Sequence, residues 1–267
     1  MINYLESFPG WVIVSISMTS SILMSIIIVY SIKFICPIKY SDGLSITVKS
    51  LITFRLIGAV SLILGFAIVM SNTAYQSSIM NVAEEAHQIE RISNTIDIMN
   101  AESRNEIREY LINYTKSIVR NEWANMGNSD SYTGDPITKK YLHDLFRSIN
   151  TAQSKLENDN INFREIYLAE EQAEILRQRR LTNAHQEIPG IFWGIAIVFF
   201  LLINCLGALL EIDKVHHNLL FLTVTSSVIG LLAGFLLIMS HPFSGNVSVS
   251  PHPLEEVIKT LERVDSP

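Results

Sequence analysis

Charged side chains are scarce in this chain, and they are unevenly spread. Asp, Glu, Lys and Arg make up 17% of its 267 residues, against about 25% in a typical soluble domain. They gather in the middle of the chain and are missing from four long windows. The net charge of −6 comes mostly from that central region. No basic surface therefore indicates a nucleic-acid partner.

Cysteine is scarce as well, and the patterns of common active sites are missing. Cys36 and Cys205 lie far apart, at or within apolar segments, which excludes a disulfide framework and a zinc site. We expect both thiols to be reduced and packed. The sequence has no nucleophile–base pair, no His and Cys at metal-ligand spacing and no phosphate-binding loop. It therefore predicts no enzyme, no metal site and no cofactor.

The four charge-poor windows are long enough to cross a bilayer, which needs about 20 apolar residues in a helix. They predict transmembrane helices over about 11–32, 51–75, 191–210 and 219–240. The fold class expected is an all-α integral membrane protein with a helical soluble domain, residues 76–187, between the second and third spans. Residues 241–267 are expected to form a short strand (247–250), a turn and a docking helix.

One stretch, Arg55 to Met99, joins the membrane part to the soluble part. Its first half has no charge after Arg55, and in its second half apolar residues recur at steps of three and four between charged ones. This spacing is typical of an amphipathic helix. We therefore predict one long helix that begins in the membrane and continues into water.

Within the soluble region, two local signals stand out. Asp135 followed by Pro136 predicts a helix N-cap and a proline at the first helical position. In the last helix, about 162–186, an acidic half precedes a basic half, which suits the helix dipole. We interpret these charges as a solvated face, with Glu174 and Arg177 forming an (i, i+3) pair.

Small and polar residues in the spans leave two interpretations open, close helix packing or the lining of a polar path. The serines at four-residue steps in the first span, Asn204 in the third, and the stripe of Ser226, Gly230 and Gly234 in the fourth favour packing. In the second span, a small or polar stripe is set against large apolar residues, and either packing or a pore face fits. That stripe comprises Gly58, Ser61, Gly65, Ile68, Asn72 and Tyr75, and the apolar residues are Leu62, Phe66 and Val69.

Short motifs spread over nearly the whole chain resemble the bestrophin-like family, long catalogued as a membrane domain of unknown function in bacteria and plants. The residues that carry the resemblance are Tyr75, Val82, Glu85, Ala86, Glu122, Trp123, Pro189, Trp193, Pro242, Phe243, Ser244, Gly245, Val249, Ser250 and Pro251. Neither the bestrophin neck signature nor the acidic calcium clasp has a match.

The resemblance implies a pentameric ion channel, mostly anion-selective, with four membrane helices per subunit and a pore lined by the second span. Carried onto this sequence, it implies the pore-lining candidates Gly58, Ser61, Gly65, Phe66, Ile68, Val69 and Asn72. Lys and Arg flank the spans about equally on both sides, so the charge rule for membrane orientation gives a tie. The resemblance places the central domain and both termini in the cytoplasm. The frequent use of Ile, Ser and Asn fits a bacterial source, so we expect the spans to lie in the inner membrane.

Two function classes follow. The first is a homo-oligomeric ion channel whose partners are the lipid bilayer and further copies of the chain. The alternative is a membrane-anchored scaffold or sensor without conduction, whose helical domain binds a protein partner.

Overall fold

The computed structural model describes residues 8–35, 46–126, 134–155, 163–184, 188–208, 215–240, 242–243 and 248–263. All regular elements within these ranges are helical. Four helices are long and apolar enough to cross a membrane, over Gly10–Ile32, Leu51–Ile96, Gly190–Ala208 and Leu219–Met239. The predicted fold class, an all-α membrane protein with four spans, is confirmed. The described residues form two compact units, one of residues 8–73 and 188–240, the other of residues 74–184, 242–243 and 248–263.

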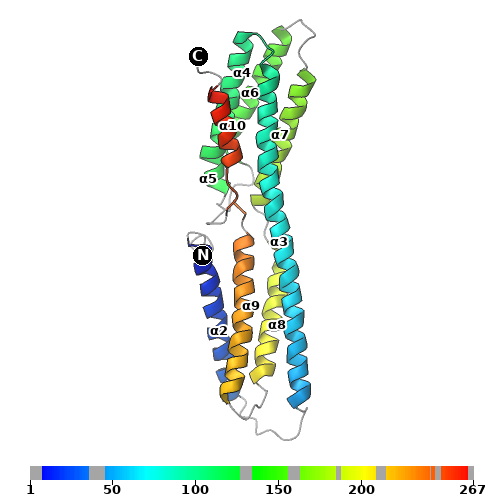
Figure 1. The fold of residues 1–267 in the computed structure, drawn as a ribbon, viewed down its shortest axis with the longest axis vertical. Coiled ribbons are helices and arrows are strands. Elements are labelled where there is room, and N and C mark those ends of the chain that lie inside the picture. The colour runs from blue at the N-terminus through cyan, green and yellow to red at the C-terminus, as the bar shows by residue number, and fades with distance from the viewer. Residues whose placement is uncertain are drawn as a thin grey trace. The chain divides into compact units, whose positions relative to one another are not determined.

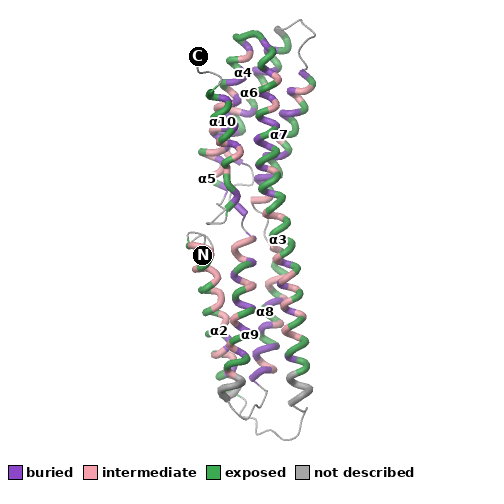
Figure 2. The backbone as a smooth tube through the Cα atoms, viewed as in Figure 1, coloured by how far each residue is buried: buried purple, intermediate pink, exposed green. Residues whose placement is uncertain are grey.

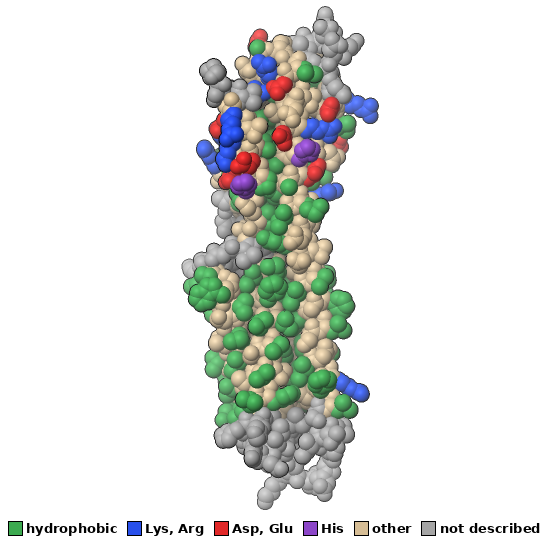
Figure 3. Space-filling model, in the orientation of Figure 1, with side chains coloured by type: hydrophobic (Ala, Val, Ile, Leu, Met, Phe, Trp, Pro, Cys, Tyr) green, Lys and Arg blue, Asp and Glu red, His purple; other side chains and the backbone are tan. Residues whose placement is uncertain are grey.

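The first unit is a bundle of helices (Figure 1), and these helices are rich in apolar residues. It contains α2 (Gly10–Ile35), the first part of α3 (Ile46–Ile96), α8 (Gly190–Ala208) and α9 (Val215–Met239). The face of this unit seen in Figure 3 carries many hydrophobic and few charged side chains. Such a surface suits the hydrocarbon of a bilayer rather than water.

Close packing of α2 against α9 depends on small residues. A Cβ atom added to Gly230 would lie 2.8 Å from the Ser17 carbonyl oxygen, and one added to Gly234 would lie 2.9 Å from the Val14 Cα. The Ser21 hydroxyl donates a hydrogen bond of 2.7 Å to the Ser226 carbonyl oxygen. The predicted packing role of this stripe is confirmed, because side chains larger than hydrogen at the two glycines would separate the helices.

Asn204 is fully buried in this unit and makes two hydrogen bonds. Its amide nitrogen donates to the Phe200 carbonyl oxygen at 2.8 Å, and its Oδ1 accepts a bond from the Ser25 hydroxyl of α2. The packing interpretation of Asn204 therefore holds, since the amide joins two helices inside an apolar bundle.

The second unit is a helical bundle with a continuous apolar core (Figure 2). Besides the second part of α3, it contains α4 (Ala101–Ser117), the π-helical turn η1 (Ile118–Glu122), α5 (Trp123–Met126), α6 (Pro136–Lys155), α7 (Phe163–Ala184) and α10 (His252–Arg263). The isoleucines that the periodicity placed on one face of α3, Ile89, Ile92 and Ile96, are at most 1% exposed. Figure 3 shows acidic and basic side chains on the surface of this unit.

Capping residues set the helix boundaries in this unit. The Asn100 side chain accepts a hydrogen bond from the Ser103 amide at 2.9 Å and caps α4. Asp135 accepts a bond of 2.8 Å from the Thr138 amide, and α6 begins at Pro136. The predicted N-cap is confirmed, since a side-chain oxygen here satisfies an amide that has no partner within the helix.

The C-terminal segment differs from the prediction in one respect. Residues 248–250 form no strand, and Val247 lies outside the described residues; instead the Val249 amide makes a single backbone bond of 2.7 Å to the Pro242 carbonyl oxygen. The alternating pattern is too short to specify a strand without a paired neighbour. The predicted docking helix is present as α10, which packs on α4.

Cys205 is a partly buried free thiol in α8. Cys36 lies outside the described residues.

Candidate functional site

Most of the pore-lining candidates of α3 are uncovered in the single chain. Phe66 is 60% exposed and Val69 62%, and Gly58 and Asn72 are exposed as well. A Cβ atom added to Gly58 or Gly65 would meet no atom within 4 Å. This side of α3 is therefore available to lipid or to another protein chain.

The remaining candidates lie at the margin of this side. Ser61, Gly65 and Ile68 are partly buried, and Ile68 packs against the apolar core of the first unit. The buried side of α3 carries Val60, Leu64 and Ala67, each at most 2% exposed.

The sequence pattern predicted a small or polar stripe on one side of this helix, with Leu62, Phe66 and Val69 on the opposite side. The structure corrects this arrangement. Leu62, Phe66 and Val69 are exposed beside Gly58 and Asn72, because steps of three, four and seven residues return to nearly the same side of a helix. The true opposite side is the buried one.

In the second unit, four charged side chains form a buried cluster at its core. Arg180 is fully buried between two carboxylates. Its Nε donates to Glu85 Oε2 at 2.7 Å and its Nη2 to Glu85 Oε1 at 3.0 Å. The same Nη2 donates to Glu122 Oε2 at 2.9 Å. These bonds join α7 to both α3 and the π-helical turn.

Arg177 completes the cluster from the next turn of α7. Its Nη2 donates to Glu122 Oε1 at 2.5 Å and its Nε to Glu122 Oε2 at 3.2 Å. The Asp135 amide also donates to Glu122 Oε1, at 3.2 Å. Two arginines thus balance two glutamates, and such paired, hydrogen-bonded charges are the kind that proteins bury.

Gly134 permits this arrangement next to α6. Its φ is 69°, in the left-handed region that side chains with a Cβ rarely adopt. A Cβ atom there would lie 2.7 Å from both Arg177 Nη2 and Glu122 Oε1. The glycine therefore supplies both the backbone turn and the space that the cluster needs.

Aromatic and sulfur contacts surround Arg180. Its guanidinium carbon lies 5.4 Å from the ring centroid of Trp123, within the range of a cation–π contact. Trp123 in turn meets Phe243 edge to face, with centroids 5.5 Å apart, and Nη1 of Arg180 lies 3.0 Å from the Met126 sulfur.

The electrostatics of the cluster keep the arginines charged. Burial alone would lower the pKa of Arg180, but the neighbouring Glu85 and Glu122 raise it above its ordinary value. Burial, followed by the charge of Glu85, raises the pKa of Tyr114, whose hydroxyl makes no hydrogen bond to the described residues. The cluster carries no net charge. Its hydrogen bonds hold α3, α7 and the π-helical turn together, which is a structural role.

Comparison with known proteins identifies the fold family. A family model named Bestrophin-like domain matches residues 20–254. The chain belongs to the bestrophin-like family. The expectation from the short sequence motifs is therefore confirmed, and the chain is a membrane protein of this family.

Solved structures agree with this assignment at the level of the fold. Three crystal structures of point variants of a bacterial bestrophin homologue from Klebsiella pneumoniae match 94% of the chain each. Their TM-scores are 0.63, 0.62 and 0.61, their sequence identities are 15%, 15% and 16%, and 98%, 98% and 96% of the homologue's chain is covered. The sequence has no significant match among curated proteins.

The bestrophin-like motif residues fall into both units. Glu85, Trp123 and Phe243 meet at or beside the charge cluster, and half-buried Tyr75 packs against the core of the same unit. Pro242 is buried, Ser250 Oγ accepts a bond of 3.2 Å from the His252 amide, and the Pro251 carbonyl accepts the Leu254 amide at 2.9 Å. Trp193 packs in the first unit, where the exposed Pro189 begins the turn into α8. Ser244 and Gly245 lie outside the described residues.

The arginines of the cluster were not predicted from the sequence, where the charges of α7 were interpreted as a solvated face. Arg177 and Arg180 are at most 2% exposed, and so is Glu170. Arg177 pairs with Glu122 rather than with the predicted Glu174. A signal was present, because both arginines fall on the apolar stripe that runs through Ala173 and Leu176, where a charge requires a buried partner.

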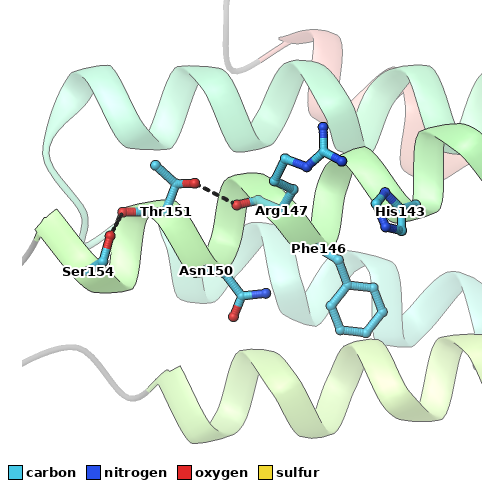
Figure 4. A pocket seen from close by; sticks show the side chains of 6 residues that line it. All are labelled: His143, Phe146, Arg147, Asn150, Thr151 and Ser154. Carbon is cyan, nitrogen blue, oxygen red and sulfur yellow. Dashed lines mark hydrogen bonds between the residues drawn. The ribbon is translucent and has the colours of Figure 1, made fainter.

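The outer side of α6 carries a shallow open groove of about 450 Å³. Figure 4 shows its lining, which comes from α6 alone: His143, Phe146, Arg147, Asn150, Thr151 and Ser154. All but Phe146 have polar side chains, and none is acidic.

Proposed function

We propose that this bestrophin-like protein assembles into a homo-oligomeric ion channel whose pore is lined by the first part of α3. The supporting observation is the exposed side of α3 in the single chain. Gly58 and Gly65 have nothing within 4 Å of the Cβ position, while Val60 and Leu64 on the other side are buried. A ring of copies would place the exposed sides of α3 around a central axis.

Along this proposed pore face, polar residues lie on either side of an apolar middle. Asn72 and Ser61 offer hydrogen-bonding groups, while Phe66 and Val69 offer large apolar side chains that are 60% and 62% exposed. Apolar constrictions gate channels by excluding water, and polar rings on either side hold ions. Phe66 is therefore the proposed constriction.

Family membership extends the proposal to details beyond the single chain. A pentamer, conduction of anions, an inner-membrane location and a cytoplasmic helical unit are what the bestrophin resemblance implies, and we propose each of them here. The proposal includes no catalytic step.

The test is ion flux into liposomes that contain the purified protein, with chloride and potassium measured separately. Phe66→Ala is expected to increase the flux, because a smaller side chain widens the constriction and weakens the exclusion of water. Phe235→Ala is the matched control, since Phe235 is a 40% exposed phenylalanine of α9. Tight liposomes around a well-formed oligomer, with both the wild type and Phe66→Ala, would refute conduction.

A further inference from the structure

The outer side of α4 carries three exposed glutamates. Glu102, Glu106 and Glu109 are exposed, and none of them forms an ion pair within the part of the chain that the structure describes. Lys116, further along the same helix, is already paired with Glu262 of α10 at 2.6 Å. We call the three glutamates the acid face of α4.

The neighbouring helix α6 offers hydrogen-bond donors along its groove. Arg147 is exposed and forms no ion pair with a described residue. Asn150 Oδ1 accepts a bond of 2.7 Å from the Tyr167 hydroxyl, which leaves the amide hydrogens to donate. The Ser154 hydroxyl donates only to a carbonyl of its own helix. We call Arg147, Asn150 and Ser154 the donor face of α6; Figure 4 shows all three.

The residues of the two faces are spaced alike along their helices and lie at nearly the same heights along the bundle. α4 and α6 pack together, and Ser117 Oγ near the end of α4 lies 2.7 Å from Thr138 Oγ1 near the start of α6. The helices are therefore antiparallel, with Ser117 level with Thr138. Counting eight residues back from Ser117 reaches Glu109, and eight forward from Thr138 reaches position 146, next to Arg147.

The same count continues along both helices. Glu106 falls level with position 149, next to Asn150, and Glu102 falls level with position 153, next to Ser154. Each pair is offset by one residue, or about 1.5 Å along the helix axis. Both faces are exposed, and no ion pair joins them within the described part of one chain.

We propose that the acid face of α4 in one copy of the chain binds the donor face of α6 in the next copy, with Glu109 opposite Arg147. A rotation axis parallel to the helices preserves both their levels and their directions, so it presents the two faces to each other antiparallel and in register. Because the contact joins two different surfaces, it is heterologous, and repetition about the rotation axis of the proposed oligomer makes it close into a ring. This inference rests on the proposed homo-oligomer and names one of its contacts.

Disulfide cross-linking tests the contact. In a full-length background with Cys36→Ser and Cys205→Ser, the double variant Glu109→Cys with Arg147→Cys is expected to give, on oxidation, a ladder of covalent multimers. Each chain carries both halves of the contact, so links propagate around the ring. Either cysteine alone is expected to give no ladder, and Arg147→Cys with Gln172→Cys on the exposed side of α7 serves as the control.

Charge reversal gives a second, independent readout by oligomer mass in detergent. Arg147→Glu is expected to shift the protein to smaller species, and adding Glu109→Arg is expected to restore the ring. A wild-type ring without the ladder and without rescue would overturn this contact while leaving the proposed channel intact. A wild type that is monomeric would overturn both proposals. Thermal unfolding of each variant shows that it is folded.

Discussion

Removing Arg180 is the sharpest test of the buried charge cluster. Arg180→Met deletes three charge-assisted hydrogen bonds to Glu85 and Glu122 and leaves Glu85, which is fully buried, without a cation. Breaking a buried ion pair in this way costs about 3–5 kcal/mol. Arg177→Met is expected to cost less, because Arg180 still bridges both glutamates in that variant.

The assay is unfolding of the purified protein by heat or denaturant, followed by tryptophan fluorescence. Trp123 contacts Arg180 and reports on the cluster directly. A loss of this size lowers the melting temperature by about 10 °C in a protein of this length. Arg179→Met, an exposed neighbour on the same helix, is the matched control and is expected to change stability by less than about 0.5 kcal/mol.

A double variant separates lost packing from the effect of an unpaired charge. Arg180→Met with Glu85→Met removes both charges of one pair, and it is expected to recover most of the stability, since apolar replacements of a buried pair are often neutral or stabilising. If Arg180→Met melted like Arg179→Met, the cluster would not be buried as described. If the double variant were no more stable than the single one, the unpaired charge would not be the cause.

Two further predictions concern α7 and the membrane bundle. Burial, followed by the charges of Glu174 and Glu171, raises the pKa of Glu170 from 4.5 to about 8. The stability that this carboxyl contributes is therefore full below pH 4.5 and is lost as the pH rises towards 8, by at most about 1.4 kcal/mol per pH unit. Glu170→Gln is expected to flatten this part of the pH profile of unfolding, and an unchanged slope would contradict the assignment. Gly230→Ala is expected to lower the free energy of unfolding by about 1–3 kcal/mol, because the added methyl group overpacks α2 against α9. Gly194→Ala is the control and is expected to be neutral, since a Cβ atom there meets nothing within 4 Å. Equal melting temperatures of the two variants would show that the helices accommodate the methyl group without loss of stability.

Local patterns in the sequence were sufficient for the helical membrane fold. The charge-free runs predict the spans because a bilayer requires length and apolarity, which are properties of a segment alone. The same holds for the N-cap at Asp135, where the partner is only three residues away. The stripe of Gly230 and Gly234 likewise predicts close packing, although not which helix fills it.

The candidate site could be predicted only in part. Glu85 and Trp123 were singled out by resemblance to a family, but their partner Arg180 lies 95 residues from Glu85 in the chain, and no periodicity joins such positions. The division of the second span was wrong as well, because Phe66 and Val69 share an exposed side with Gly58, as helical spacing requires.

By itself, then, the sequence determined which segments are helices and which of them suit a bilayer, since these depend on local periodicity and composition. Its short motifs indicated the family by resemblance. The tertiary structure decided which partner each buried charge has. Arg180 and Arg179 are neighbours of the same type on one helix, yet one is fully buried between two carboxylates and the other is exposed. The difference arises from the helices that pack around α7, because the cost of burying a charge is offset only where packing brings its partner within hydrogen-bonding distance.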